Sequence, residues 1–169
     1  MGRWRPPRKA GSPYITPTGY RALQDELEAM WPRRREVVAA LSAAAAEGDR
    51  SENAEYIYRK KELAGIDRRI RYLQKRMPNL EVVRHSVPPD RVFFGATVTL
   101  DVGKEAFLCY RLVGEDEADP ANGNINVDSP VAQALMKKSV GDEVLIIMGT
   151  EQLAAVIQSI EYDIEGGAQ

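Results

Sequence analysis

Two runs of apolar residues with matched helical spacing constrain this chain more than any other feature of its sequence. Residues 20–41 and 56–77 each place large apolar side chains three and four positions apart, and an arginine fills one gap in each run. This spacing is typical of a coiled-coil seam. Two seams of equal length joined by a short turn predict an antiparallel helical hairpin. The seam positions are Tyr20, Leu23, Leu27, Met30, Arg34, Val37 and Leu41, and then Tyr56, Arg59, Leu63, Ile66, Ile70, Leu73 and Met77.

The first helix is expected to run from Thr18 to about Ala46, with Thr16 or Thr18 as its cap. A helix of that length extends roughly 45 Å at 1.5 Å per residue. Pro32 removes one backbone donor from the helix interior, so we expect a kink near residues 28–31. The helix is not expected to break there, because the seam resumes in phase.

The second helix is expected from about Ser51 to Met77, where Pro78 ends it. Gly48 supplies a turn conformation that other residues adopt only at a cost. The turn between the helices is acidic: Glu47, Asp49, Glu52 and Glu55 lie within nine residues, against the single cation Arg50. Because acidic side chains repel one another, an acidic tip predicts a cationic target, which we take to be a metal ion in a partner's active site.

The charge of the chain is divided unevenly along its length. Residues 1–77 carry 17 basic and 10 acidic side chains, whereas residues 78–169 carry 6 and 15. This asymmetry predicts two parts with two partners, and the basic half is a candidate for nucleic acid or another polyanion. Solvated helix faces remain the alternative. Residues 1–13 are basic and rich in proline and glycine, which predicts a flexible leader, and residues 164–169 are expected to form a tail.

The second half of the chain has the pattern of a small α+β domain over residues 78–163. Five expected strands, with one short helix between the third and the fourth, predict a mainly antiparallel sheet. The strands are expected at residues 92–100, with a possible bulge at Gly95, and at 107–113, 124–127, 144–148 and 153–162. An acidic loop is expected at residues 115–123, and Asp128, Ser129 and Pro130 are a good start for a helix over 131–136.

Several classes of protein are excluded or disfavoured by the sequence. It has no run of eighteen apolar residues, so we expect no membrane span, and no apolar segment follows the basic N-terminus as in a signal peptide. The single cysteine, Cys109, fits a reducing cytoplasm. One cysteine and one histidine, His85, cannot build a His/Cys metal site or a Cys–His nucleophile pair within one chain.

From Tyr14 to Tyr162 the sequence resembles the bacterial Gre transcript-cleavage factor family, and its GreB branch most. The resemblance rests on several long motifs in the right order: residues 14–16 with Gly19-Tyr20, and residues 48–56, 66–73, 92–96, 127–130 and 140–144. It implies an N-terminal antiparallel coiled coil and a C-terminal domain of FKBP-like fold. It also implies binding to RNA polymerase at the rim of its secondary channel, with the coil passing down the channel and its tip reaching the catalytic centre.

The resemblance maps the two functional tip acids onto Asp49 and Glu52. Phosphodiester hydrolysis needs an activated water and a clamp on the attacking and leaving oxygens, which two metal ions provide. Magnesium prefers hard oxygen ligands, so carboxylates delivered from outside would help a polymerase hold its second magnesium ion. We expect Asp49 to hold that ion, and Glu52 to help hold it or to position the attacking water. Glu55 and Tyr56 are expected to support the tip, and no cofactor intrinsic to the chain is expected.

Each of these site residues also has a purely structural explanation. Asp49 and Glu52 have the spacing of a helix capping box, and Ser51 could cap instead. Tyr56 and Tyr58 could stack on a base or pack the end of the hairpin. The resemblance places a polymerase contact near Asp128, Ser129 and Pro130, which could equally be a helix cap. Extruded RNA could be bound by Arg59, Lys60, Arg68, Arg69 and Arg71, which could instead pair with Glu26, Glu28 and Glu36.

The function expected from the resemblance is that of a cytoplasmic bacterial transcription elongation factor. Such a protein is not an enzyme alone but activates the cleavage of backtracked RNA by RNA polymerase. We expect a monomer whose partners are RNA polymerase and the nascent RNA 3′ end, with no membrane, and the motifs favour longer cleavage fragments. One alternative is a polymerase inhibitor that enters the same channel without promoting cleavage. Another is a coiled-coil interaction or chaperone protein, in which the tip acids are only helix caps.

Overall fold

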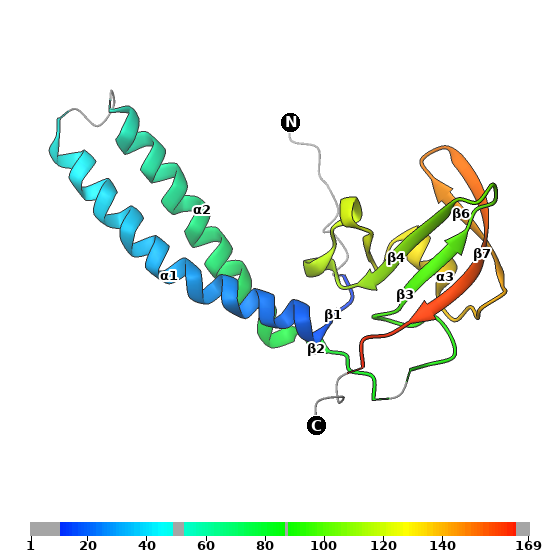
Figure 1. Ribbon diagram of the computed structural model, residues 1–169. Coiled ribbons are helices and arrows are strands. Elements are labelled where there is room, and N and C mark those ends of the chain that lie inside the picture. Colours follow the sequence, from blue (N-terminus) through cyan, green and yellow to red (C-terminus); the bar gives the residue numbers. More distant parts are fainter. Residues whose placement is uncertain (1–10, 49–52, 87, 165–169) are drawn as a thin grey trace, which may run out of the picture. The chain divides into compact units, whose positions relative to one another are not determined.

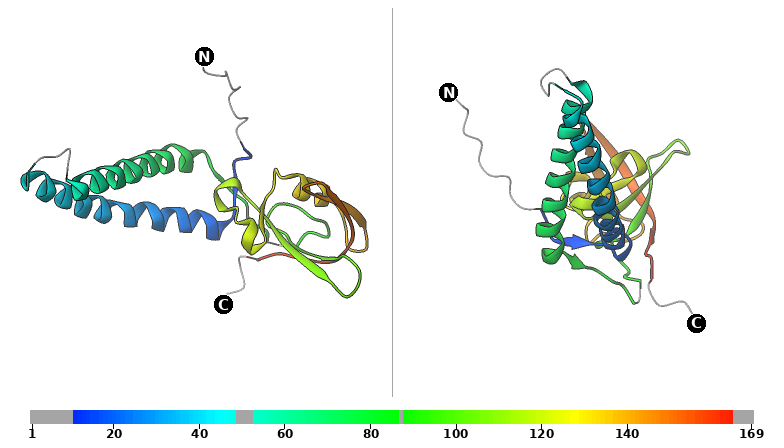
Figure 2. Two further views of the ribbon diagram at one scale, coloured as in Figure 1. Left: turned by 90° about the horizontal axis from the view of Figure 1, so that it is seen from above. Right: turned by 90° about the vertical axis from the view of Figure 1, so that its left-hand side faces the viewer.

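The computed structural model describes residues 11–48, 53–86 and 88–164. The chain divides into two compact units, which are drawn in Figures 1 and 2. One unit is the helical segment Thr18–Leu80, and the other combines Met1–Pro17 with Glu81–Gln169. A mixed α+β fold with an N-terminal helical hairpin and a C-terminal sheet is therefore confirmed.

The helical unit is an antiparallel hairpin of two long helices. Helix α1 spans Pro17–Ala46 and helix α2 spans Ala54–Arg76, and the two lie side by side in both figures. A short 3-10 turn, η1 (Met77–Asn79), follows α2. Pro32 lies inside α1, which continues through it, so the helix is not broken there.

The predicted seam is the interface of the hairpin. Leu23 and Val37 of α1 and Ile70 and Leu73 of α2 are buried, and the other predicted seam residues are at least half-buried. The two arginines predicted to fill gaps in the seam, Arg34 and Arg59, are also partly buried. A single row of apolar contacts thus holds the hairpin together, as expected for two amphipathic helices in a coiled coil.

The segment before α1 belongs to the C-terminal unit and not to the hairpin. Strand β1 (Tyr14–Ile15) pairs in parallel with strand β2 (Glu81–Val82), and Ile15 is fully buried. The predicted hairpin boundary at residue 14 is therefore wrong by a few residues, because strand pairing and burial of Ile15 fix this segment to the sheet domain. The predicted flexible leader is also wrong for residues 11–13, since Ser12 and Pro13 make hydrogen bonds to that domain. Residues 1–10 lie outside the described part.

The C-terminal unit is built on a five-stranded sheet. Its strands are β3 (Thr97–Asp101), β4 (Phe107–Val113), β5 (Asn124–Asn126), β6 (Glu143–Met148) and β7 (Glu151–Glu161), in the spatial order β5-β4-β3-β7-β6. Neighbouring strands are antiparallel except for β4 and β5. The short helix α3 (Pro130–Leu135) buries Ala132 and Leu135 in the core of this unit. The short 3-10 turns η2 (Glu115–Glu117) and η3 (Pro120–Asn122) occupy the predicted acidic loop.

The predicted strand over residues 92–100 is only partly correct. Burial alternates from Arg91 to Asp101 as expected for a strand, but β3 begins at Thr97. At its start the predicted strand bonds to a loop, since Val92 N donates to Lys138 O over 2.8 Å. The predicted bulge at Gly95 is confirmed: Gly95, with a φ of +84°, donates from its nitrogen to Leu112 O, and Ala96 O accepts from Leu112 N, so two residues face one residue of β4. A second register shift falls between Thr99 and Leu100, on the side of β7.

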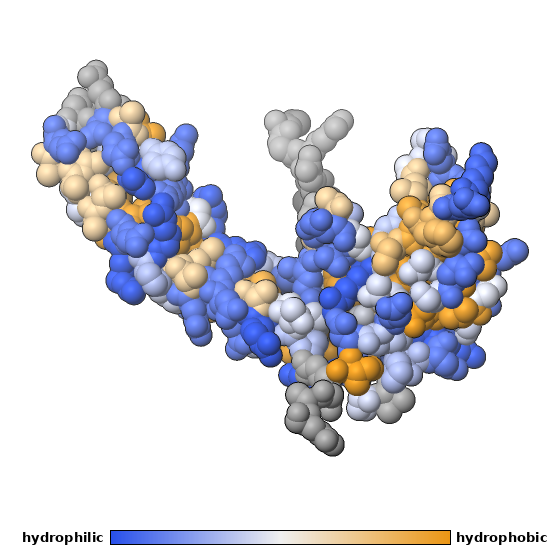
Figure 3. Space-filling model, in the orientation of Figure 1, coloured by the Kyte–Doolittle hydropathy of each residue, from blue (hydrophilic) through white to orange (hydrophobic). Residues whose placement is uncertain are grey.

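Apolar side chains are also exposed on the C-terminal unit. Leu145 and Ile147 of β6 are 51% and 54% exposed, because they alternate with the buried Val144 and Ile146. Figure 3 shows apolar side chains gathered on the part of this unit that contains the sheet, whereas the hairpin surface is mainly hydrophilic. Within the described ranges no helix has both the length and the apolar character needed to cross a membrane.

Candidate functional site at the hairpin tip and along its shaft

The structure describes the residues on either side of the hairpin tip, up to Gly48 and from Asn53 onward. Asp49 and Glu52, the two acids predicted to be functional, lie outside the described residues, as do Arg50 and Ser51. On the side of α1, Gly48 has a φ of +142°, a conformation that side-chain-bearing residues rarely adopt. This agrees with the turn role predicted for Gly48.

Asn53 joins the two helices directly behind the tip. Its Nδ2 donates to the backbone oxygen of Ala44 over 2.8 Å, while its Oδ1 accepts from the backbone nitrogen of Tyr56 over 3.1 Å. One side chain therefore binds a carbonyl in the last turn of α1 and an amide in the first turn of α2. Sequence reasoning missed this residue, although asparagine is among the preferred N-cap residues.

The position of Asn53 corrects the prediction for the start of the second helix. The N-cap of α2 is Asn53, and the helix begins at Ala54, not near Ser51. The cap of α2 is therefore Asn53, and not Asp49 or Ser51, which the sequence pattern offered as caps. A structural explanation of the tip acids as caps of α2 loses its main support.

Glu55 and Tyr56 support the tip in a structural way. Glu55 Oε1 accepts from Arg59 Nε over 2.7 Å, one turn along the same helix. Tyr56 is half-buried at the end of the hairpin. Tyr58 is 59% exposed, and the guanidinium of Arg59 lies 5.4 Å from the centre of its ring. Of the two tyrosines, only Tyr58 presents much of its surface to solvent.

The basic residues of the shaft fall into two groups. Arg69 donates to both carboxylate oxygens of Glu26 across the hairpin, over 2.6 and 2.8 Å. Arg59 pairs with Glu55 and with Glu62, the latter over 3.0 Å, within α2. The ion-pairing alternative is therefore confirmed for Arg69 and Glu26, and the guanidinium of Arg59 is also engaged.

The other three predicted basic residues, Lys60, Arg68 and Arg71, are exposed and make no ion pair with any described residue.

The two remaining acids named in the ion-pairing alternative do not bridge the helices in the described part. Glu36 pairs with Arg33 on its own helix over 3.3 Å, and no pair involves Glu28. Lys60, Arg68 and Arg71 thus remain available to an external anion.

Two further ion pairs bridge the helices at the middle of the shaft. Arg34 Nε donates to Asp67 Oδ1 over 2.7 Å, and Arg33 donates to Glu62. One of these pairs uses Arg34, the arginine of the α1 seam, and Glu62 in the other pair also binds Arg59, the arginine of the α2 seam. Charge pairing thus adds to the apolar packing of the seam along this part of the hairpin, where Val37 is fully buried.

The ion pairs lower the pKa of two carboxyl groups. The hydrogen bond from Arg69 holds the pKa of Glu26 below its ordinary value of 4.5, against a smaller opposing effect of burial. Hydrogen bonds from Arg33, and less strongly from Arg59, lower the pKa of Glu62 in the same way. A lowered pKa in the folded state means that the ionised carboxylate stabilises the fold.

We predict from these pKa values that the hairpin loses stability in acid. The stabilisation is complete above the ordinary pKa of 4.5 and is lost as the pH falls below it through the lowered values. Thermal unfolding followed by the helical circular dichroism signal should show a midpoint that declines below about pH 4.5. The variant Glu26→Gln should start from a lower midpoint at pH 7 and decline less. An equal decline in both proteins would contradict the role of Glu26.

The predicted polymerase contact, Asp128 to Pro130, lies at the start of α3. Ser129 is the N-cap, its Oγ accepts from Ala132 N over 3.3 Å, and Pro130 is the first helical residue. The cap explanation is therefore correct for Ser129. The carboxylate of Asp128 instead binds the N-terminal segment, accepting from the nitrogen and the Oγ of Ser12 over 2.7 and 2.5 Å. Asp128 and Pro130 are exposed, so both remain accessible to a partner.

Glu117 is a second anchor of the N-terminal segment. Its Oε2 accepts from Thr16 N over 2.9 Å and from Gly114 N over 3.1 Å, and its Oε1 accepts from the hydroxyl of Thr16. Thr16, which is 4% exposed, immediately precedes α1. Sequence reasoning placed Glu117 in an acidic loop and gave it no role, because its partner lies 101 positions away.

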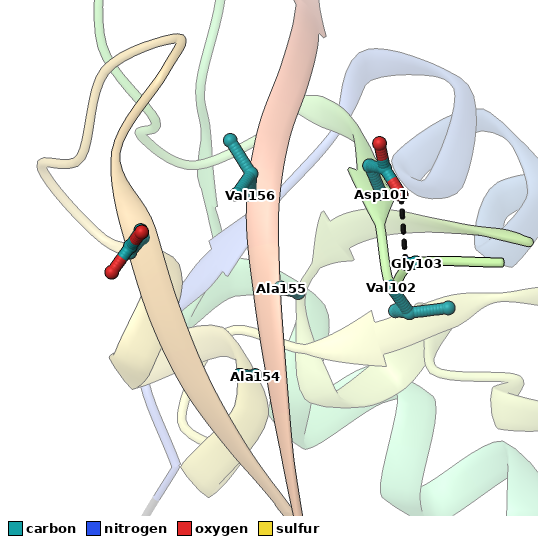
Figure 4. Close-up of a pocket in the computed structure, with 7 residues that line it drawn as sticks. Asp101, Val102, Gly103, Ala154, Ala155 and Val156 are labelled. Atoms are coloured by element: carbon teal, nitrogen blue, oxygen red, sulfur yellow. Dashed lines mark hydrogen bonds between the residues drawn. The ribbon is translucent and has the colours of Figure 1, made fainter. Parts of the chain in front are cut away.

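A small pocket on the sheet is lined by none of the predicted site residues. Figure 4 shows Asp101 and Val156 at this pocket, with the hydrogen bond of 2.8 Å from Gly103 N to Asp101 Oδ1. The carboxylate of Asp101 thus closes a turn. Within the described ranges, no three His, Cys, Asp or Glu side chains lie close enough together to hold a metal ion.

His85 and Tyr162 hold the segment before β3. Tyr162 donates from its hydroxyl to Arg91 O over 2.5 Å and accepts from Phe93 N over 2.8 Å. Burial raises the pKa of this hydroxyl. The ring of His85 lies edge-on to Tyr162 at 4.7 Å, and its Nε2 is 2.8 Å from Phe94 O. The single histidine is thus used in packing.

Comparison with known proteins agrees with this architecture over nearly the whole chain. Residues 13–82 match the family model described as "Transcription elongation factor, N-terminal", and residues 87–162 match "Transcription elongation factor, GreA/GreB, C-term". The two matched segments correspond to the hairpin and to the sheet domain.

Three curated relatives, each named transcription elongation factor GreB, are similar to the chain over nine tenths of its length or more. The relative from Xanthomonas axonopodis pv. citri is 52% identical, and the match covers 96% of this chain and 98% of that protein. The relative from Pseudomonas aeruginosa is 49% identical with the same coverage, and the one from Yersinia pestis is 48% identical over 90% of this chain and 91% of its own. With both family models matched in order, the chain belongs to the GreA/GreB family of transcription elongation factors.

Proposed function

We propose that this protein is a transcription elongation factor that binds RNA polymerase and stimulates the polymerase's own cleavage of backtracked RNA. The observation that carries the proposal is a slender hairpin whose closed end leaves Asp49 and Glu52 between Gly48 and the cap residue Asn53. The relatives named transcription elongation factor GreB support the same function. In this role the chain activates another enzyme and does not catalyse the reaction alone.

The shape of the hairpin suits delivery of a small acidic tip into a narrow space. Helix α1 has 30 residues, so it extends roughly 45 Å. Ala44 is buried near its end, which lets the two backbones approach closely. We propose that the hairpin enters the secondary channel of the polymerase and that its tip reaches the catalytic centre.

The tip contributes hard oxygen donors to that centre. When bound there, a second magnesium ion would activate the attacking water and stabilise the leaving oxygen. Asp49 is proposed to bind this ion, and Glu52 to bind it as well or to orient the water. Carboxylates are the donors that magnesium prefers, and one or two of them are often sufficient. The amide of Asn53 and the turn at Gly48 hold the ends of the loop that carries both acids.

The proposal is tested with purified RNA polymerase stalled in a backtracked complex with labelled RNA. Addition of the chain should shorten the RNA rapidly, and the chain should compete with a labelled copy of itself for the polymerase. Binding without cleavage would overturn the proposal in favour of an inhibitor that enters the same channel. No binding would leave a coiled-coil interaction protein.

We predict that Lys60, Arg68 and Arg71 contact the extruded RNA. Each phosphate contact to a single strand contributes roughly 0.7 to the slope of log affinity against log salt. Replacing all three residues by alanine should therefore reduce that slope by about 2 for complexes with extruded RNA. Fluorescence anisotropy over a range of salt concentrations measures this slope.

The matched control for this prediction replaces Arg21, Arg35 and Lys138, three exposed cations elsewhere on the chain, by alanine. This control removes the same charge and should leave the slope nearer that of wild type. Equal effects of the two triple variants would show that only net charge matters, and would contradict a local RNA contact.

A further inference from the structure

We infer that Asn53 is a positioning residue for the tip acids, acting through its hydrogen bond to α1 and not only as the cap of α2. This inference rests on the proposed function, because it assigns a role in presenting Asp49 and Glu52 to the polymerase. Its structural basis is the side-chain amide, which contacts both helices at once.

The two hydrogen bonds of Asn53 have separable effects. Through its Oδ1, Asn53 accepts a hydrogen bond from Tyr56 N, an amide in the first turn of α2, and any good N-cap residue would do the same. The bond that Nδ2 donates to Ala44 O crosses to the other helix, nine positions back in sequence. Serine, threonine and aspartate can provide the first bond, but an amide of this length is needed for the second.

The cross-helix bond lies where it can fix the distance between the two helix ends that carry the tip. Ala44 lies in the last turn of α1, and Glu47 N also bonds to Ala44 O over 3.3 Å. A single carbonyl therefore ties together the exit of α1 and the entry of α2. Behind it the nearest ion pairs that cross the hairpin, at Arg33 and Arg34, lie about ten residues further down α1. Asn53 is thus the polar link between the helices that lies nearest the tip in the described part.

Loss of this link should allow the two ends of the tip loop to move apart while the helices remain folded. Catalytic groups displaced by about 1 Å can cost on the order of 100-fold in rate. The acids would still be present, and the surfaces that bind polymerase would be unchanged. The expected signature is reduced cleavage at saturation with unchanged binding.

The decisive variants are Asn53→Ser and Asn53→Asp in the full chain. Serine retains a cap acceptor and adds no charge, but its hydroxyl occupies the place of Cγ and does not reach Ala44. Aspartate retains the length and the cap acceptor but has no donor. Both should lower the cleavage rate at saturating factor by about tenfold, with the dissociation constant for polymerase within about twofold of wild type. Asn53→Ala, which also loses the cap, serves as the comparison for a helix-end defect.

A second readout does not depend on cleavage. Spin labels at Ala46→Cys and Ala54→Cys, in a Cys109→Ser background, report the distance between the helix ends. Asn53→Ser should broaden this distance distribution, while the helical circular dichroism signal and its thermal midpoint change little. An unchanged distribution, or cleavage equal to wild type in both variants, would overturn the inference. Loss of binding in proportion to loss of cleavage would also overturn it. Failure of the wild-type chain to cleave would instead count against the proposed function.

Discussion

Replacing Asp49 by asparagine or Glu52 by glutamine should abolish most of the stimulated RNA cleavage without releasing the protein from RNA polymerase. Each substitution preserves side-chain size but removes a negative charge and one hard oxygen donor. Groups that only support a metal ligand already cost about 10–100-fold in activity when they are lost, so a direct ligand should cost at least that much. The measurement is the rate of RNA shortening in the stalled complex at saturating factor.

Binding measured by competition separates this result from misfolding. Glu47→Gln is the matched control, because it removes a carboxylate from the same acidic tip at a position that the proposal does not use. It should retain most of the activity. If Glu47→Gln were as inactive as the other two variants, general negative charge at the tip would explain the effect better than two specific ligands.

Leu73→Ala should destabilise the hairpin by about 2–5 kcal/mol. Leu73 is fully buried on the seam, and the hairpin has few other buried residues to compensate for the cavity. Helices α1 and α2 contain 30 and 23 residues against 6 in α3, so the helical circular dichroism signal reports mainly on the hairpin. Urea unfolding followed by this signal gives the change in free energy.

Gln74→Ala is the control for Leu73→Ala, because the neighbouring residue is exposed on the same helix. Its effect should stay within about 0.5 kcal/mol. A similar small effect of Leu73→Ala would contradict the assignment of the seam as the source of hairpin stability. The sheet domain should keep its own unfolding transition in both variants, since Leu73 lies outside that unit.

Features that repeat along the chain could be predicted from the sequence. The seam follows from the spacing of apolar residues, and every predicted position from Tyr20 to Met77 is at least partly buried. The predicted bounds of strand β4 agree with the structure, because residues 107–113 are a run of aromatic and apolar side chains that only Arg111 interrupts and that Gly114 ends. Local periodicity carries this information, since it reflects which face of each element is buried.

Features that depend on distant partners could not be predicted. The bond from Ser12 to Asp128 joins residues 116 positions apart, and no local pattern reveals it. The start of α2 was misplaced for a different reason: Asp49, Ser51 and Asn53 are all acceptable caps, and a contact with Ala44 favours Asn53. At Arg59 and Arg69 the sequence offered both RNA and carboxylates as partners, and the choice depends on which acids the folded hairpin brings near.

The most direct test of the proposed mechanism is the magnesium concentration at which RNA cleavage by the stalled polymerase reaches half its maximal rate. It is measured with and without the wild-type chain. If the tip acids help the polymerase hold its second magnesium ion, the chain should lower this concentration by about tenfold or more. Asp49→Asn should return it to the value of polymerase alone. An increase in cleavage at an unchanged magnesium requirement would contradict the account.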